Sequence, residues 1–221
     1  MKRHIVFDLD GTLVDSLPGI AEGVNRSLRA LGKPEHSLSA VSRMIGSGAA
    51  NLCGMALGYE DAAHTPPEEL EAMHAEFRRH YPQCWQYPLT RAYPWIANML
   101  TLLSAEGAEL AVLSNKPHDV TEPMVRAIFP HIPFSTILGY TGEFPRKPAP
   151  DSLHYIASRW GIPTSEITMV GDSLYDARTA QNAGCGLALV AWGYANVRDL
   201  AAWPAPTFGS VDELRHYLLN S

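Results

Sequence analysis

The sequence has little cysteine, no long apolar run and no cluster of like charge. Its three cysteines, Cys53, Cys84 and Cys185, lie far apart and form no Cys-X-X-Cys pair, which favours reduced, buried thiols in a cytosolic protein. No stretch approaches the roughly 18 apolar residues that a membrane span needs. The apolar run that follows the basic N-terminus breaks at Asp8, too early for a secretory signal. We therefore expect a cytoplasmic protein.

Charge is also sparse and shows no basic bias. Lys and Arg number 17 against 23 Asp and Glu, giving a net charge of -6, which argues against a nucleic-acid partner. The chain has 221 residues and is 46% hydrophobic, enough for one ordinary domain with a smaller appendage. We expect a monomer or homodimer that acts on a small molecule, with no nucleic-acid or membrane partner.

Short apolar segments alternate with helical patterns over most of the chain. This alternation predicts the α/β class, with a Rossmann-like, doubly wound parallel sheet whose faces are covered by helices. A first strand ends at Asp8. Further strands are predicted at residues 109–113, 136–139, 167–170 and 186–191. Helices are predicted at residues 95–105, 118–129 and 150–160, and from the end of the 167–170 strand to residue 183.

Residues 15–90 contain no convincing strand. Apolar residues recur there at helical spacing, and the predicted helices cover about residues 17–31, 38–45, 49–57 and 67–80. Because this block follows the first strand, we expect an all-helical cap domain of residues 15–90 inserted into an α/β core of residues 1–14 and 91–221.

Polar groups stand where the predicted strands end. In an open parallel sheet, ligands bind beyond the carboxyl ends of the strands, so these groups are expected to meet in one crevice. Each has an ordinary alternative: a turn for Ser114 and Asn115, a surface position for Lys147, an N-cap for Asp172. Their joint occurrence favours a site. The set comprises Asp8, Asp10, Ser114, Asn115, Lys147, Asp172 and Asp176.

This combination of groups suits phosphoryl transfer. Four carboxylates against one ammonium need a cation, and hard oxygen ligands select Mg²⁺. A carboxylate can attack phosphorus, with Mg²⁺ and Lys147 offsetting the repulsion between the two anions. A second Asp two residues later can protonate the leaving alkoxide and then deprotonate water. Gly11 allows the sharp turn under the phosphate.

The four segments that carry these groups resemble the motifs of the haloacid dehalogenase superfamily of aspartyl-phosphate hydrolases. They are DLDGT at residues 8–12, LSNK at 113–116, RKPAP at 146–150 and VGDSLYDA at 170–177. The resemblance covers nearly the whole chain. It implies a Rossmann-like core with a helical cap between the first and second motifs.

The resemblance also implies a role for each residue of the site. Asp8 is the expected nucleophile and Asp10 the general acid/base. Ser114 and Lys147 are expected to hold the phosphate, with Gly11, Thr12 and Asn115 beside them. The expected Mg²⁺ ligands are Asp8, the backbone carbonyl of Asp10, Asp172 and Asp176, the last directly or through water.

Within the superfamily the chain is most similar to phosphoglycolate phosphatases, on residues 45–49, 111–117 and 192–194. Substrate specificity is expected from the cap residues Arg43, Gly46, Ser47 and Gly48. One departure lies here. Such phosphatases often carry an arginine three residues before the Ile of the Ile-Gly pair, where this chain has Ser42 and then Arg43. One position on a helix is a rotation of about 100°, so Arg43 is either a substrate contact or a solvated helix residue.

The sequence thus predicts a Mg²⁺-dependent phosphatase acting on a small phosphomonoester of the phosphoglycolate type through an aspartyl-phosphate. Two alternatives stay open. A β-phosphoglucomutase-type sugar-phosphate mutase shares all four motifs and returns the phosphate to a sugar. A non-catalytic regulator that binds a phosphorylated metabolite is disfavoured, because a pure binder has no need of the Asp8 and Asp10 pair.

Overall fold

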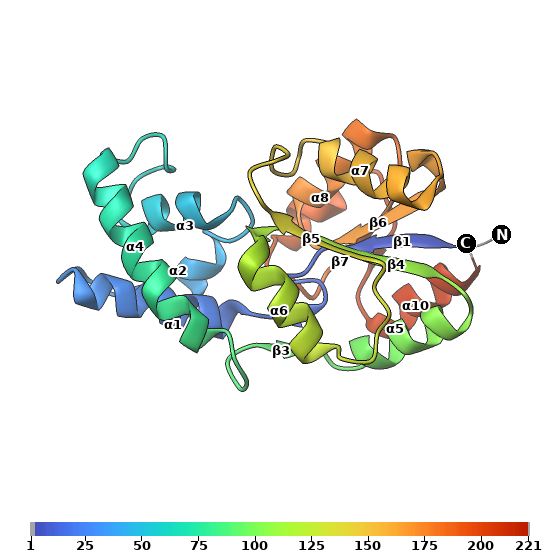
Figure 1. The fold of residues 1–221 in the computed structure, drawn as a ribbon, viewed down its shortest axis with the longest axis horizontal. Helices are drawn as coiled ribbons and strands as arrows, with labels where there is room; N and C mark the ends of the chain where they lie inside the picture. The colour runs from blue at the N-terminus through green and yellow to red at the C-terminus, as the bar shows by residue number, and fades with distance from the viewer. Residues whose placement is uncertain (1–2, 221) are drawn as a thin grey trace. The chain divides into compact units, whose positions relative to one another are not determined.

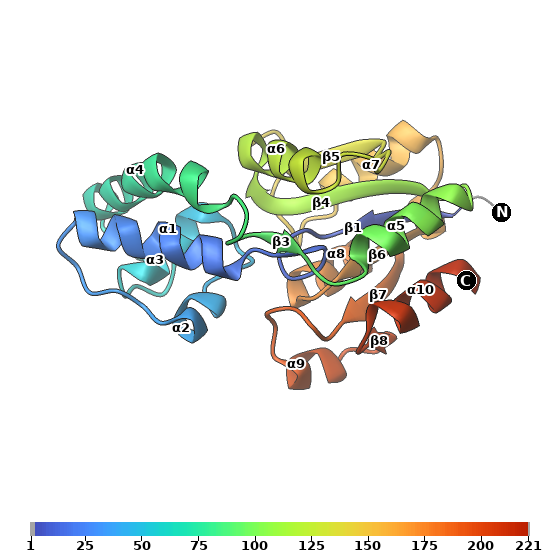
Figure 2. The same ribbon diagram turned by 90° about the horizontal axis from the view of Figure 1, so that it is seen from below.

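The computed structural model describes residues 3–220. Its main feature is a six-stranded parallel sheet in the order β5-β4-β1-β6-β7-β8 (Figures 1 and 2). The strands are β1 (His4–Phe7), β4 (Glu109–Pro117), β5 (Thr136–Tyr140), β6 (Ile167–Gly171), β7 (Gly186–Val190) and β8 (Thr207–Phe208). This is the doubly wound α/β fold that the sequence predicts, and the predicted fold class is confirmed.

The central strand β1 is buried along its whole length. It pairs in parallel with β4 on one side, where Phe7 lies opposite Val112, and with β6 on the other, where Phe7 lies opposite Val170. Strands covered on both faces read as continuous apolar runs, which explains why β1, β4 and β6 were visible in the sequence. Their carboxyl ends lie at the same edge of the sheet.

Helices cover both faces of this sheet. Figures 1 and 2 show α7 (Asp151–Trp160) and α8 (Leu174–Ala183) on one face, and α5 (Ile96–Ala105), α6 (His118–Ile128) and α10 (Val211–Asn220) on the other. A buried cluster that includes Val6, Met169 and Ile156 joins the sheet to α7 and α8. Two short elements, η1 (Thr164–Glu166) and α9 (Val197–Ala201), complete this part of the chain.

A second, helical unit is inserted after β1. The chain divides into two compact units, Met1–Val14 with Ala92–Ser221 and Asp15–Arg91. The inserted unit holds α1 (Leu17–Ala30), α2 (Leu38–Ser42), α3 (Ala49–Ala56) and α4 (Pro67–Cys84), and the chain enters and leaves it through the paired strands β2 (Val14–Asp15) and β3 (Arg91–Ala92). Its helices α1 and α4 pack closely, because Gly23 lets the rings of Phe77 and Tyr81 approach the α1 backbone.

Several element boundaries differ from the predicted ones. β4 does not stop at Ser114 but runs on to Pro117, and its pairing with β5 shifts in register between Leu113 and Pro117. α4 continues to Cys84, and α2 ends already at Ser42. The sequence pattern did not indicate β8, α9 or α10, which are short or weakly patterned. None of the helices described between residues 3 and 220 is both long and apolar enough to cross a membrane.

Candidate active site

The predicted site residues of the α/β unit gather at the carboxyl edge of the sheet. Asp8 directly follows β1, and its N–H still donates to the carbonyl of Val170 on β6, at 2.8 Å. Asp172 directly follows β6, and Ser114 lies within the last residues of β4. Neighbouring parallel strands therefore bring three separate stretches of the chain to one place.

Lys147 is the centre of this cluster. Its ammonium donates to Asp8 Oδ1 and to Asp176 Oδ1, both at 2.6 Å, and to the carbonyl of Leu113 at 3.1 Å. Its side chain is only 4% exposed, which rules out the surface position that was the alternative. Three acceptors match the three N–H bonds of an ammonium, so the lysine is held in one orientation.

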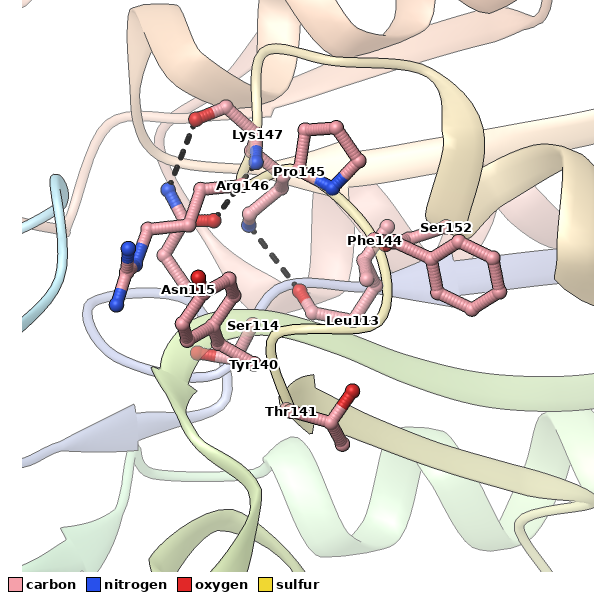
Figure 3. Close-up of a pocket in the computed structure, with 11 residues that line it drawn as sticks. Leu113, Ser114, Asn115, Tyr140, Thr141, Phe144, Pro145, Arg146, Lys147 and Ser152 are labelled. Atoms are coloured by element: carbon pink, nitrogen blue, oxygen red, sulfur yellow. Dashed lines mark hydrogen bonds between the residues drawn. The ribbon is translucent and has the colours of Figure 1, made fainter.

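Asn115 holds the backbone of Lys147. The Asn115 side-chain amide donates to the carbonyl of Lys147 at 3.0 Å, and the Lys147 N–H donates to Asn115 Oδ1 at 2.8 Å (Figure 3). These two bonds join the end of β4 to the loop after β5. Ser114 and Asn115 thus belong to a strand, and their alternative as a turn is wrong. The predicted contact of Asn115 with phosphate stays a prediction.

Asp172 sits in a narrow space between two glycines. A Cβ atom on either Gly11 or Gly193 would overlap its carboxylate. The carboxylate accepts from the Thr12 hydroxyl at 3.2 Å and from the Tyr194 N–H at 2.7 Å. Gly11 adopts a φ of +89°, which L-residues with a side chain rarely do. The loop at residues 192–194 therefore orients Asp172, a function that the sequence analysis did not assign to it.

Asp176 lies one turn into α8. It forms a capping box with Ser173, whose N–H and hydroxyl donate to Asp176 Oδ2 at 3.1 and 2.6 Å. The N-cap of α8 is Ser173, so the alternative of Asp172 as an N-cap is wrong. Because Asp176 also accepts from Lys147, both of its oxygens are held by neighbouring residues.

Burial dominates the electrostatics of these groups. Burial is the main reason that the pKa of Asp8 lies well above its ordinary value, with Asp176 and Asp172 raising it further and Lys147 lowering it. Burial and the charge of Asp176 raise the pKa of Asp172 to about 7. Burial lowers the pKa of Lys147, but the carboxylates of Asp176 and Asp8 outweigh it and raise that pKa above its ordinary value.

The donor set fits a divalent cation. Asp8, Asp172 and Asp176 are buried, and each offers a carboxylate oxygen within 4.8 Å of those of the other two. Three buried carboxylates around one ammonium leave an excess of negative charge. All the donors are hard oxygens, the ligands that Mg²⁺ prefers. A cation there would offset the free-energy cost of burying ionised carboxylates, which is what raises the pKa of Asp8 and Asp172.

Comparison with known proteins decides the family. A model of the haloacid dehalogenase-like hydrolases matches residues 5–190, most of the chain. The chain belongs to this family. The resemblance read from the four motifs is thereby confirmed.

The relatives within the haloacid dehalogenase-like family include several phosphoglycolate phosphatases. The chain is 34% identical to phosphoglycolate phosphatase 1 of Pseudomonas aeruginosa, over 99% of this chain and 79% of that protein. A phosphoglycolate phosphatase of Shigella boydii is 33% identical over 87% of this chain and 82% of that protein. The structure of a predicted phosphoglycolate phosphatase from Haemophilus somnus has a TM-score of 0.86 at 30% identity, covering 98% of both chains.

One residue of the haloacid dehalogenase-like site escaped the sequence analysis. Lys116 reaches back to Asp10, and its ammonium donates to the two carboxylate oxygens at 3.0 and 2.9 Å. Their side chains are 6% and 12% exposed. The signal was present in the LSNK motif, but sequence alone does not indicate that this lysine meets a carboxylate 106 positions away.

The predicted cap residues lie in the helical unit. Arg43 is exposed and is the C-cap of α2, while Gly48, with a φ of +95°, is the N-cap of α3. Gly46 and Ser47 lie between these helices, and the Ser47 carbonyl accepts from the side chain of Asn51 at 3.4 Å. Their contact with a substrate stays a prediction.

Proposed function

We propose that this protein is a Mg²⁺-dependent phosphatase that hydrolyses a small phosphomonoester of the phosphoglycolate type through an aspartyl-phosphate on Asp8. The observation that carries this proposal is the position of Lys147, whose ammonium bonds Asp8 at the centre of a buried carboxylate cluster. Membership of the family and similarity to several phosphoglycolate phosphatases support it.

In the first step, an Asp8 oxygen attacks phosphorus and the bond from phosphorus to the ester oxygen breaks. The attacking carboxylate and the phosphate are both anions, and their repulsion is the main barrier to approach. Lys147 lowers that barrier, because its charge lies 2.6 Å from Asp8. Ser114, next to Asn115 at the end of β4, is proposed to donate its hydroxyl to a phosphate oxygen.

Asp10 is proposed to move the proton. It gives a proton to the departing alkoxide, which avoids releasing a strong base. It then takes a proton from the water that attacks the aspartyl-phosphate, so that phosphate leaves and the carboxylate of Asp8 is regenerated. Asp10 lies two residues after Asp8, beyond the end of β1, where it can face the ester oxygen.

The metal site is proposed at the same carboxylates. Asp8, Asp172 and the backbone carbonyl of Asp10 would hold Mg²⁺, with Asp176 as a direct or water-mediated ligand. When bound, the ion supplies positive charge against the phosphate dianion. Thr12 and Tyr194 keep the Asp172 carboxylate in place, and Gly11 leaves room for it.

We propose that the inserted unit is a cap, bounded near residues 15 and 90, and that Arg43, Gly46, Ser47 and Gly48 contribute to substrate choice. We further propose a cytoplasmic location. All three cysteines are free, and burial raises the pKa of the Cys53 thiol to about 12, which keeps it in its unreactive thiol form.

The test is phosphate release across a panel of phosphomonoesters, with Mg²⁺ and with EDTA. The panel includes phosphoglycolate, ethyl phosphate, p-nitrophenyl phosphate, sugar phosphates and nucleotides. We expect turnover that needs Mg²⁺, with the highest kcat/KM for phosphoglycolate. Isomerised sugar phosphate in place of free phosphate would favour the mutase, and no Mg²⁺-dependent turnover of any compound would favour the binding protein.

A further inference from the structure

The site holds a second buried ammonium that the proposed chemistry does not use. Lys116 has a side chain only 6% exposed, and lysine is almost never fully buried unless it is paired. Its partner is Asp10, through both carboxylate oxygens. Lys147, by contrast, serves Asp8 and Asp176. The two lysines therefore bond different carboxylates, while Asp172 accepts from the Thr12 hydroxyl and the Tyr194 N–H.

The backbone places Lys116 beside the residue proposed to bind phosphate. The Lys116 N–H donates to the Ser114 hydroxyl oxygen at 3.2 Å. Both residues lie in the part of β4 where the register with β5 shifts, and such irregularities re-aim side chains near active sites. Lys116 thus connects the residue proposed for the phosphate with the residue proposed for the leaving group.

In the proposed reaction Asp10 approaches the ester oxygen to protonate it, and this would bring its partner Lys116 close to the leaving group. An uncharged alkyl leaving group gains nothing from an ammonium at this position. A leaving group that carries a carboxylate one carbon away from the ester oxygen gains a charge-assisted hydrogen bond. Phosphorylated 2-hydroxy acids have this arrangement.

We propose that Lys116 is a specificity residue that binds the carboxylate of a phosphorylated 2-hydroxy acid. The inference rests on the proposed phosphatase activity and identifies the part of the substrate that the α/β unit binds. The charge balance agrees with it. Two ammonium groups and one divalent cation match the four carboxylates of Asp8, Asp10, Asp172 and Asp176, so an anionic substrate enters a site without excess negative charge.

The proposal also bears on the displaced arginine of the helical unit. Arg43 stands one position away from the place where phosphoglycolate phosphatases often carry an arginine. With Lys116 as the carboxylate ligand, recognition of a 2-hydroxy acid phosphate does not depend on that arginine.

The test compares two substrates in Lys116→Met, Lys116→Arg and the parent. Phosphoglycolate and ethyl phosphate share a skeleton, with a carboxylate in the first where the second has a methyl group. In K116M, kcat/KM falls for both, because Asp10 loses its partner. The ratio of the two values falls by about 10- to 150-fold, the range expected for one hydrogen bond to a charged group. K116R recovers part of the ratio, and Lys33→Met, at an exposed ion pair, leaves it unchanged.

A binding measurement separates recognition from turnover. Calorimetry with Mg²⁺ present compares 3-phosphonopropionate, in which a methylene replaces the ester oxygen of phosphoglycolate, with propylphosphonate, which lacks the carboxylate. In the parent, 3-phosphonopropionate binds more tightly, and K116M removes most of that advantage while its circular dichroism spectrum matches that of the parent.

The remaining outcomes overturn the inference in distinguishable ways. An unchanged substrate ratio in K116M means that Lys116 only positions Asp10. The parent enzyme could instead hydrolyse ethyl phosphate or p-nitrophenyl phosphate with no preference for phosphoglycolate. That outcome overturns the role of Lys116 and still supports the proposed phosphatase activity. A parent that hydrolyses no phosphomonoester overturns the proposed function itself.

Discussion

Two ion pairs of nearly equal length differ in their exposure to water. Lys147 lies 2.6 Å from Asp8 at the edge of the sheet, and Arg26 lies 2.7 Å from Glu22 on α1. The side chains are 4% and 10% exposed in the first pair and 37% and 33% exposed in the second. Water screens the α1 pair, whereas the buried pair must offset the loss of hydration. A short distance alone therefore does not tell how much an ion pair contributes to the free energy of unfolding.

Removing the buried ammonium gives the largest expected effect. Lys147→Met leaves Asp8 and Asp176 without their shared partner, and we expect metal-free protein to lose about 3 to 5 kcal/mol in the free energy of unfolding. Turnover of every phosphomonoester falls by at least about 1000-fold, since the charge opposite the nucleophile is gone. Urea denaturation in EDTA and phosphate release measure the two effects. A loss below about 1 kcal/mol would mean that water reaches the pair.

Asp8→Asn separates catalysis from stability. The amide cannot form the aspartyl-phosphate, so turnover falls to background. Burial holds the pKa of Asp8 well above its ordinary value, which means that the ionised carboxylate costs free energy in the native state. We therefore expect the unfolding free energy to stay within about 1 kcal/mol of the parent. Thermal denaturation checks this, and a variant that retains turnover would remove Asp8 as nucleophile.

The stability of the protein should depend on pH through Asp172, whose pKa is raised from 3.8 to about 7. A raised native pKa means that the folded protein keeps a proton that the unfolded chain releases. The corresponding stability is fully present below about pH 4 and is lost as the pH rises through about 7. A divalent cation replaces that proton, so Mg²⁺ should raise the Tm more at about pH 8 than at about pH 5.

The matched variant for this prediction is Asp172→Asn. It should lose most of the Mg²⁺-dependent rise in Tm at both pH values. It should also unfold at a higher temperature than the parent in EDTA near neutral pH, because position 172 then has no carboxylate to ionise next to Asp8 and Asp176. Equal Mg²⁺ shifts at the two pH values in the parent would contradict the link between this carboxylate and the metal.

The smallest effect belongs to the exposed pair. Arg26→Ala breaks the contact with Glu22, and we expect a change of less than about 0.5 kcal/mol in the free energy of unfolding. The change should shrink further in high salt, since exposed charges are screened. Urea denaturation at two salt concentrations measures it. A cost comparable to that of Lys147→Met would show that burial is not what distinguishes the two pairs.

The sequence predicts the parts of the fold that depend on local pattern. β1, β4 and β6 are apolar runs that end at polar residues, so the sheet and the gathering of Asp8, Ser114 and Asp172 at one edge could be foreseen. The N-cap of α8 was not predicted: the sequence analysis considered Asp172 for it, whereas Ser173 caps the helix, and the Ser-X-X-Asp spacing of residues 173 and 176 is the signal that could have shown this. The roles of these residues in the reaction remain predictions.

The rest depends on contacts that no local pattern encodes. β8 is two residues long and exists through its pairing with β7. The continuation of β4 beyond Ser114 follows from its neighbour β5, and a polar Ser-Asn-Lys run reads locally as a loop. Lys116 meets Asp10 only because parallel pairing of β1 and β4 brings their ends together.

The paired strands β2 and β3 have a consequence for how this architecture can vary. Residues 14–15 and 91–92 lie hydrogen-bonded side by side, so the inserted stretch starts and finishes at neighbouring points. A segment with adjacent ends can be lengthened, shortened or exchanged without shifting the register of β1 against β4 and β6. The groups of the proposed reaction lie outside the inserted stretch, so grafting a different segment between these two points should change the choice of substrate and leave those groups in place.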